Sequence, residues 1–89
     1  MIIEFDKTFY KYLDKISGAN VKGRIINIII EIEKAKSINE IKNIKKLAGF
    51  QKYFRIRLGD YRIGFELINS KTIRFILIVH RKDIYKIFP

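Results

Sequence analysis

The sequence predicts a single α+β domain, in which an N-terminal strand and a two-helix hairpin precede a three-stranded antiparallel meander and a short C-terminal helical tail. The 89 residues, 48% of them hydrophobic, are enough for one small core. Apolar residues recur with a helical period in the first half of the chain and alternate with a period of two in the second. No repeat, low-complexity tract or linker divides residues 1–89, so we expect one domain with the helices on one face of the sheet.

The first strand and helix have recognisable boundaries. Residues 2–5 (IIEF) predict a short strand, and Asp6 is suited to cap the helix that follows. Apolar residues then recur at helical spacing as far as Ile16, and Ser17-Gly18 is expected to end this helix.

A second helix is expected from Asn20, its predicted cap, through VKGRIINIIIEIEKAK. Its isoleucines follow a 3.6-residue period, although they are β-branched and have only modest helix propensity. We expect Ile26 and Ile30 to widen its buried stripe; the alternative is an exposed edge that receives a partner segment. Residues 37–51 read as a connector with about one helical turn.

The next two strands form a predicted hairpin. Residues 52–58 and 61–67 both alternate apolar and polar positions. Gly59-Asp60 suits a two-residue hairpin turn, which places Arg57 directly opposite Arg62. Both apolar sets then share one face of the sheet.

A third strand is expected over residues 72–79. A three-residue loop at 69–71 matches the apolar faces by pairing Leu67 with Ile73, Phe65 with Phe75 and Ile63 with Leu77. The same register pairs Glu66 with Arg74. It also places Ile73, Phe75, Leu77 and Val79 on one face, and brings His80 to the face and hairpin end that carry Arg57 and Arg62.

This geometry gathers Arg55, Arg57, Arg62 and His80 on the face opposite the core, with Arg81 just beyond the last strand. Like charges opposed across a hairpin weaken it by about 0.2–1 kcal/mol, and no carboxylate is obviously placed to neutralise them. Guanidinium groups stay protonated and bind phosphate in a bidentate manner. The pattern therefore indicates an anion site suited to a phosphodiester.

Charge and composition narrow the function further. The chain carries a net charge of +10, of which residues 1–40 contribute +1 and residues 41–89 contribute +9. Such a surface attracts nucleic acid, an acidic protein or an anionic membrane, although a merely solvated basic face is the alternative. The absence of cysteine excludes a disulfide framework, and a single histidine leaves little scope for a metal site. No signal peptide or membrane-spanning run is apparent, so we expect a cytoplasmic protein.

At this point the chain resembles a known family. The block KKLAGFQKYFRIRLGDYRIGFE and the closing VHRKDIYKIF, together with the order of the elements, resemble the RelE/ParE superfamily of toxins from type II toxin–antitoxin modules. The resemblance covers essentially the whole chain. It is greater for the RelE branch, whose members are ribosome-dependent endonucleases, than for the ParE branch, which acts on DNA gyrase.

The resemblance implies an enzyme that cuts mRNA in the ribosomal A site without metal or cofactor, by attack of the RNA 2′-hydroxyl on the adjacent phosphate. Its catalytic positions fall on Arg55, Arg57, Arg62, Arg81 and Tyr85. Arg62 and Arg81 would clamp the scissile phosphate, and Tyr85 would stack on a base or orient the leaving group.

The general base is unassigned from sequence, because arginine replaces the lysine that some relatives carry at positions 55 and 57. His80 is the one side chain whose ordinary pKa suits proton transfer near neutrality, and a structural or stacking role is the alternative. Five lysines are expected to contact the RNA backbone: Lys45, Lys46, Lys52, Lys82 and Lys86.

The expected partners are the ribosome, mRNA and a co-encoded RelB-like antitoxin, the last implied by the family alone. Two other functions are open from sequence. One is a ParE-like inhibitor of DNA gyrase, and the other is a basic RNA-binding module without catalysis.

Overall fold

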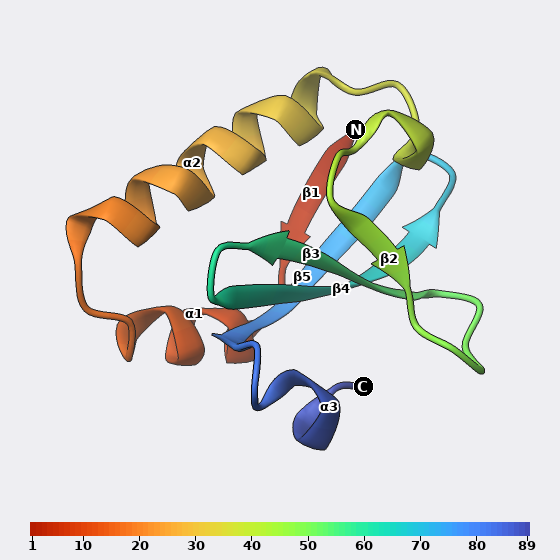
Figure 1. Ribbon diagram of the computed structural model, residues 1–89. Helices are drawn as coiled ribbons and strands as arrows, with labels where there is room; N and C mark the ends of the chain where they lie inside the picture. The colour runs from red at the N-terminus through yellow and green to blue at the C-terminus, as the bar shows by residue number, and fades with distance from the viewer.

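The computed structural model describes residues 1–89, which form a five-stranded sheet with two helices packed against one face (Figure 1). The elements in chain order are β1 (Ile2–Phe5), α1 (Lys7–Asp14), α2 (Ala19–Lys34), the 3₁₀ turn η1 (Ile38–Glu40), β2 (Ile44–Lys46), β3 (Tyr53–Leu58), β4 (Tyr61–Asn69), β5 (Thr72–His80) and α3 (Ile84–Ile87). The predicted α+β class and order of elements are confirmed. No helix is long and apolar enough to cross a membrane.

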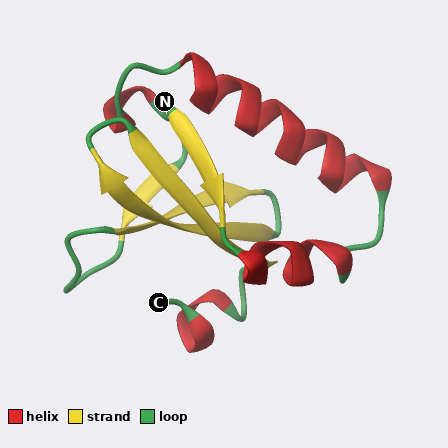
Figure 2. Ribbon diagram, turned by 180° about the vertical axis from the view of Figure 1, so that it is seen from behind, coloured by secondary structure: helices red, strands yellow, loops and turns green.

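The strands lie in the order β1-β5-β4-β3-β2, so that the first strand pairs with the last (Figure 2). β1 runs parallel to β5, and all the other pairs are antiparallel. Strand β2 was not predicted. It has only three residues, and nothing in its sequence distinguishes it from the connector in which it lies.

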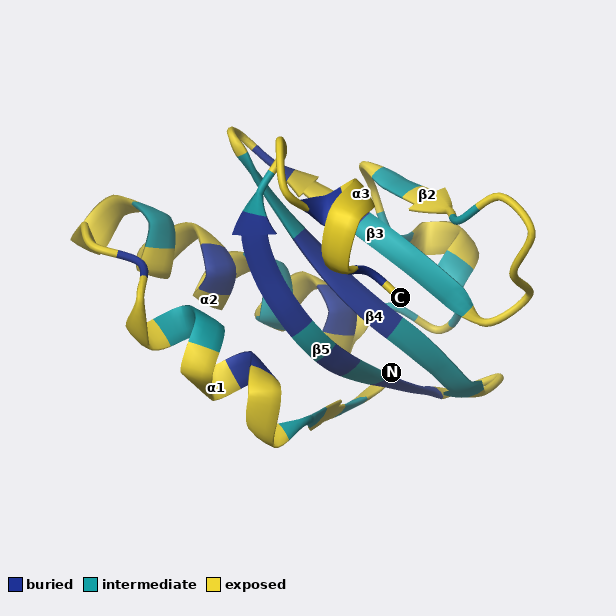
Figure 3. Ribbon diagram, turned by 90° about the horizontal axis from the view of Figure 1, so that it is seen from below, coloured by how far each residue is buried: buried dark blue, intermediate teal, exposed yellow.

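The main core fills the space between the sheet and the helices. Phe9 of α1 and Ile25 and Ile32 of α2 are buried against Phe65 and Phe75 of the sheet. A second, smaller cluster lies on the other face, where the C-terminal tail (residues 81–89) packs on the sheet (Figure 3). We call these the helix face and the tail face.

The start of α1 is as predicted, because the Asp6 side chain accepts a hydrogen bond from the backbone N–H of Thr8 at 3.2 Å. Two other boundaries were wrong. Helix α1 ends at Asp14 rather than at Ser17-Gly18. Helix α2 begins at Ala19, so its N-cap is Gly18 and not Asn20. Gly18 has a φ of 105°, a backbone conformation that glycine adopts readily.

Two isoleucines expected in the core of α2 are exposed. Ile26 is 57% and Ile30 is 44% solvent-accessible. The buried stripe is narrower than expected, because the sheet covers only the side of the helix that carries Ile25 and Ile32.

The hairpin of β3 and β4 has the predicted register, with Arg57 opposite Arg62. Gly59 has a φ of 58°, and Asp60 does not have a positive φ, as a type II′ turn requires. Glu66 lies opposite Arg74, also as predicted.

The pairing of β4 with β5 was predicted correctly only for its first half. Phe65 faces Phe75, but Gly64 then faces Leu77, which leaves Ile76 as an extra residue in a bulge. The predicted pairing of Ile63 with Leu77 is therefore wrong. The turn at the other end also differs from the three-residue loop expected, because Asn69 pairs with Thr72 after a second irregularity.

Beyond the bulge, the side chains of β5 lie on the opposite face of the sheet from the one predicted. Ile78 joins the main core opposite Ile63, whereas Leu77 and Val79 move to the tail face and pack against the tail. The prediction that Leu77 and Val79 share a face with Phe75 is therefore also wrong.

Candidate active site

Three arginines lie on the tail face because they alternate with core residues along β3 and β4. Arg55 and Arg57 alternate with buried Ile56, and Arg62 precedes buried Ile63. Cross-strand pairing sets Arg57 directly against Arg62. The hairpin itself thus brings the arginines together, as predicted.

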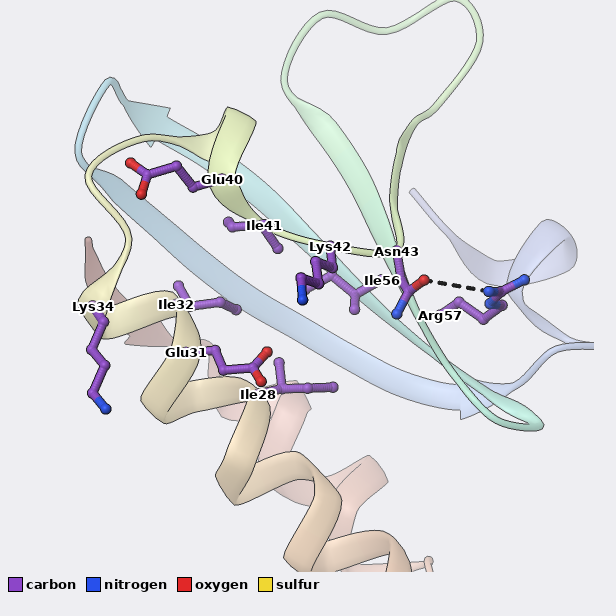
Figure 4. Close-up of a pocket in the computed structure, with 10 residues that line it drawn as sticks. All are labelled: Ile28, Glu31, Ile32, Lys34, Glu40, Ile41, Lys42, Asn43, Ile56 and Arg57. Carbon is purple, nitrogen blue, oxygen red and sulfur yellow. Dashed lines mark hydrogen bonds between the residues drawn. The ribbon is translucent and has the colours of Figure 1, made fainter.

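Hydrogen bonds hold two of these side chains in place. Arg62 Nη1 donates to the carbonyl oxygens of Gly59 at 2.7 Å and Tyr61 at 2.8 Å. Arg57 Nη2 donates to Asn43 Oδ1 at 3.3 Å (Figure 4). Asn43 has a positive φ of 60°, a backbone state that asparagine tolerates better than most residues, and its carbonyl accepts from the Arg57 backbone N–H at 2.9 Å. Sequence reasoning missed Asn43.

The positive charges of the arginines act on one another. Partial burial lowers the pKa of Arg62, and the positive charges of Arg55, Arg57 and Arg81 lower it further. A guanidinium group with a lowered pKa still carries its proton near neutrality. The four arginines, which we call the arginine cluster, therefore form a concentrated cationic site.

Only one carboxylate forms an ion pair with the cluster. Arg81 follows β5, and its backbone N–H donates to the carbonyl oxygen of Asp60 at 2.7 Å. The Arg81 Nε lies 3.9 Å from Asp60 Oδ1, and both side chains are mostly exposed. Such a pair contributes little, so most of the positive charge remains available to an anion.

The C-terminal tail brings Tyr85 to the cluster. The Arg55 guanidinium lies over the Tyr85 ring, 4.6 Å from its centroid. Ile84 and Phe88, on either side of Tyr85 in the sequence, are buried against Leu77 and Val79 and anchor the tail. Tyr85 itself is 74% exposed, so its ring and hydroxyl are accessible to a ligand.

Gly64 makes this docking possible, and sequence reasoning missed it. A Cβ at Gly64 would lie 2.9 Å from the Phe88 ring, so only glycine lets the ring pack so closely against the strand. Gly64 faces Arg55 across the hairpin. A glycine inside an alternating strand commonly marks a close approach of this kind, and it was the available signal.

An open cleft of about 370 Å³ lies beside the cluster. It is lined by Asn43, Ile44, Lys45, Arg55, Arg57 and Arg62. We call it the arginine cleft. A larger groove of about 450 Å³ between α2 and the η1–β2 segment shares only Asn43 and Arg57 with it; its lining includes Glu31 and Glu40, which makes it less suited to an anion (Figure 4).

His80 does not lie with the arginines. The bulge in β5 places it opposite Tyr61 on the helix face, with ring centroids 6.0 Å apart. Its Nδ1 accepts a hydrogen bond from the Lys82 backbone N–H at 3.2 Å. The predicted register that brought His80 to the face of Arg57 and Arg62 is therefore wrong.

The five lysines expected to contact RNA are dispersed. Lys45 faces Arg55 across β2 and β3 and lines the arginine cleft. Lys46 lines a neighbouring cleft, whereas Lys86 lines a different pocket together with His80. Lys52 and Lys82 are exposed on loops outside these clefts.

The arrangement suits a phosphodiester better than a metal or a small apolar ligand. No group of three or more histidines, cysteines or carboxylates is placed to hold a metal ion. Convergent guanidinium groups can bind the non-bridging oxygens of a phosphate and stabilise added negative charge.

The chain is similar over its full length to known toxins, although no family model matches it. It is 46% identical over 90 residues to Toxin RelE3 of Methanocaldococcus jannaschii, with all of both chains covered. A chain in the crystal structure of the RelB-RelE antitoxin-toxin complex from Methanococcus jannaschii is 45% identical; the match has a TM-score of 0.79 and covers 97% of this chain and 99% of that one.

A more distant structure shares the fold. A chain of the archaeal RelE-RelB complex from Pyrococcus horikoshii OT3 is 23% identical, with a TM-score of 0.70 over 90% of this chain and 93% of that one. Full-length similarity at 46% identity, on a fold that these structures share, shows that the chain belongs to the RelE family of toxins of type II toxin–antitoxin systems.

Proposed function

We propose that this chain is a ribosome-dependent endoribonuclease that cleaves mRNA and thereby inhibits translation. The observation that carries the proposal is the gathering of Arg55, Arg57 and Arg62 around one cleft. Arg81 lies on the turn after β5, and Asp60 is the carboxylate that pairs with it. A surface that only attracts RNA does not need such convergence. A site that stabilises a phosphate gaining charge in a transition state does.

The proposed reaction is an intramolecular phosphoryl transfer. The 2′-hydroxyl oxygen of one nucleotide attacks the adjacent phosphorus, the bond to the 5′-oxygen of the next nucleotide breaks, and a 2′,3′-cyclic phosphate forms. A proton leaves the 2′-hydroxyl, and one is delivered to the departing 5′-oxygen. No metal or cofactor is required for this balance.

We assign Arg62 and Arg81 to the scissile phosphate and Arg55 and Arg57 to the charge around it. The carbonyl oxygens of Gly59 and Tyr61 hold the Arg62 side chain in place, so its position costs little reorganisation during the reaction. Arginine cannot take up the 2′-hydroxyl proton, because it stays protonated.

Lys45 and Tyr85 are the side chains beside the cluster that can exchange a proton. His80 lies on the other face of the sheet, and we leave it out of the proposed machinery.

The test is synthesis of the chain in a translating extract, with mRNA 5′ ends mapped in the presence and absence of ribosomes. We expect cuts within codons at the A site that require ribosomes and disappear in the R62A/R81A variant. The matched control is K11A/K71A, which removes two exposed positive charges away from the cluster and should leave cleavage unchanged.

The other outcomes identify the alternatives. Induction of the chain in cells supplies a second readout. Growth arrest without cuts would indicate an inhibitor such as one of gyrase, and RNA binding with neither arrest nor cuts would indicate a non-catalytic module. The similarity to RelE favours neither alternative.

We also propose a RelB-like antitoxin as the cognate partner, acting where translation takes place, in the cytoplasm. The similar structure from Methanococcus jannaschii is a RelB-RelE complex. The net charge of +10 would attract an acidic partner strongly. Co-expression with the co-encoded candidate should yield a complex that no longer cleaves mRNA, and failure of the two chains to co-purify would count against this partner.

A further inference from the structure

We propose that a second cleft beside the arginine cleft is a binding subsite for a single RNA base next to the scissile phosphate. This inference deepens the proposed function and rests on it. The second cleft has a volume of about 330 Å³, at the lower end of the range for ligand pockets. It is lined by Lys45, Lys46, Leu47, Ala48, Phe50, Arg55, Ile84, Tyr85, Phe88 and Pro89, and we call it the aromatic cleft.

One side of the aromatic cleft is a tight turn that presents Phe50. The Phe50 backbone N–H donates to the Leu47 carbonyl oxygen at 3.2 Å, and Gly49 between them has a φ of 82°, as the third position of a type II turn requires. Phe50 also packs edge-on against Tyr53, with ring centroids 5.7 Å apart. Phe50 is nevertheless 45% exposed, so it is accessible to a ligand.

The C-terminal tail forms the other side. Tyr85 is exposed and carries the Arg55 guanidinium over its ring at 4.6 Å. Phe88 is held edge-on against Tyr53, with centroids 5.7 Å apart, and lies on Gly64. Tyr53 therefore contacts both Phe50 and Phe88, and links the turn to the tail.

The chemistry of the lining favours a nucleobase over an apolar peptide. Aromatic rings and arginine planes are the surfaces on which single-stranded RNA bases stack. Lys45, Lys46 and Arg55 supply positive charge at the same cleft, which suits the phosphates that flank a base. An apolar segment would have to desolvate these cations without pairing them.

The two clefts lie next to each other, which suits adjacent parts of one RNA strand. Lys45 and Arg55 line both of them. A phosphate bound by the arginine cluster would therefore have its neighbouring base within reach of Phe50 and Tyr85. The aromatic cleft would then set which nucleotide is preferred next to the cut.

The first test needs neither ribosomes nor cleavage. A short single-stranded RNA carrying one 2-aminopurine is titrated with the protein, because the fluorescence of this base falls when it stacks. We expect quenching with the wild type, loss of quenching with F50A together with affinity weaker by about tenfold, and recovery with F50W. The control Y10A removes an exposed aromatic ring from α1 and should quench like the wild type.

The second test maps nucleotide frequencies around the cuts in the translating extract. F50A should flatten the preference at one position flanking the cut while cutting continues, whereas R62A/R81A should abolish cutting altogether. If the wild type cuts mRNA and F50A cuts it with the same nucleotide preference, the subsite is overturned and the proposed function is left intact.

If the wild type makes no cuts, the proposed function fails and the fluorescence test still decides the subsite. Equal quenching by wild type and F50A would overturn it. Circular dichroism of F50A establishes that the variant is folded. F50W keeps an aromatic ring on the turn, so its recovery shows that the effect of F50A comes from loss of the ring and not from distortion of the turn.

Discussion

At the scale of single residues, the site depends on the missing side chain of Gly64 as much as on the charged side chains of the arginine cluster. Gly64 follows Arg62 by two residues along β4, and the Phe88 ring occupies the space that a side chain at Gly64 would fill. The charged residues could be found from sequence, because alternation along a strand decides which face they occupy. The partner of Gly64 could not, because Phe88 lies 24 residues further along the chain.

Changing Gly64 to alanine should damage the site through the tail. The new Cβ would lie 2.9 Å from the Phe88 ring, so the ring must move, and we expect a loss of about 1–3 kcal/mol in the free energy of unfolding. Displacement of Tyr85 should lower cleavage by roughly ten- to a hundredfold. Urea denaturation and 5′-end mapping measure the two effects.

The control is Gly23→Ala in α2, where no atom lies within 4 Å of the new methyl group. That change should instead stabilise the helix by about 0.5–1 kcal/mol and leave cleavage unaltered. Equal effects of the two substitutions would contradict the close packing of Phe88 on Gly64.

Replacing His80 by glutamine should barely affect the reaction. His80 lies on the helix face, and its Nδ1 already accepts a hydrogen bond from the Lys82 N–H. We expect cleavage within about threefold of the wild type and an unchanged pH profile, whereas loss of a general base typically costs about a hundredfold or more. A loss of the latter size, with a shifted pH profile, would restore His80 as a proton carrier.

At the scale of elements, the sequence predicts the strands and helices that hydrophobic periodicity marks. It does not predict features that depend on contacts between elements distant in the chain. The turn and the register of the β3–β4 hairpin were predicted correctly, because the turn residues and the alternation agree, although β3 begins one residue later and β4 ends two residues later than predicted. The bulge at Ile76 could not be predicted from the sequence of β5 alone, because the polar groups that contact it belong to Asp6 and Thr8, far earlier in the chain. The Thr8 hydroxyl oxygen lies 2.8 Å from the Ile76 carbonyl oxygen, and the Asp6 backbone N–H donates to the Phe75 carbonyl oxygen at 2.9 Å. The misplacement of His80 follows directly from that bulge.

The cap of α1 should make stability depend on pH in acid. Hydrogen bonds from the Thr8 hydroxyl and backbone N–H hold the pKa of Asp6 below its ordinary value of 3.8. A carboxyl group with a lower pKa in the folded state stabilises it above the unfolded pKa, and this stabilisation is lost as pH falls through the folded pKa.

The melting temperature of wild type should therefore exceed that of D6N at neutral pH, and the difference should shrink below about pH 4. An NMR titration of Asp6 in wild type and T8V tests the cause. The same Asp6 pKa in both proteins would rule out the Thr8 hydroxyl as the main donor.

The exposed isoleucines of α2 should contribute little to folding. Serine at both Ile26 and Ile30 should change the free energy of unfolding by about 0.5 kcal/mol or less, as at most surface positions. Alanine at Ile32, which is 1% exposed, should cost about 2–5 kcal/mol. Chemical denaturation of the two variants measures the contrast, and a large loss in the double variant would mean that this ridge is covered within the monomer.

At the scale of the whole molecule, the charge and the core are separated by the sheet. The helix face holds the main core, and the tail face holds the arginine cluster and its clefts. Composition alone predicted the charge of the second half of the chain. The five-stranded sheet, with its short edge strand β2 bringing Lys45 to the cluster, required the structure.

Binding to RNA should be strongly dependent on salt. The logarithm of affinity for single-stranded RNA falls with the logarithm of salt concentration by about 0.7 for each phosphate neutralised. Removing Arg62 and Arg81 together should therefore reduce the slope by about 1.4. Fluorescence anisotropy at several potassium chloride concentrations measures the slope, and K11A/K71A should keep the wild-type value. Equal slopes in all three proteins would mean that neither arginine contacts phosphate.

The pairing of β1 with β5 also sets when the sheet can close during synthesis. The first strand finds its neighbour only when residues 72–75 have been made. The helices α1 and α2 and the strands β2, β3 and β4 are therefore synthesised while β1 still has no strand to pair with. Closure of the sheet by β1 is expected to be a late step of folding, because the contacts that it needs are the most distant in the sequence.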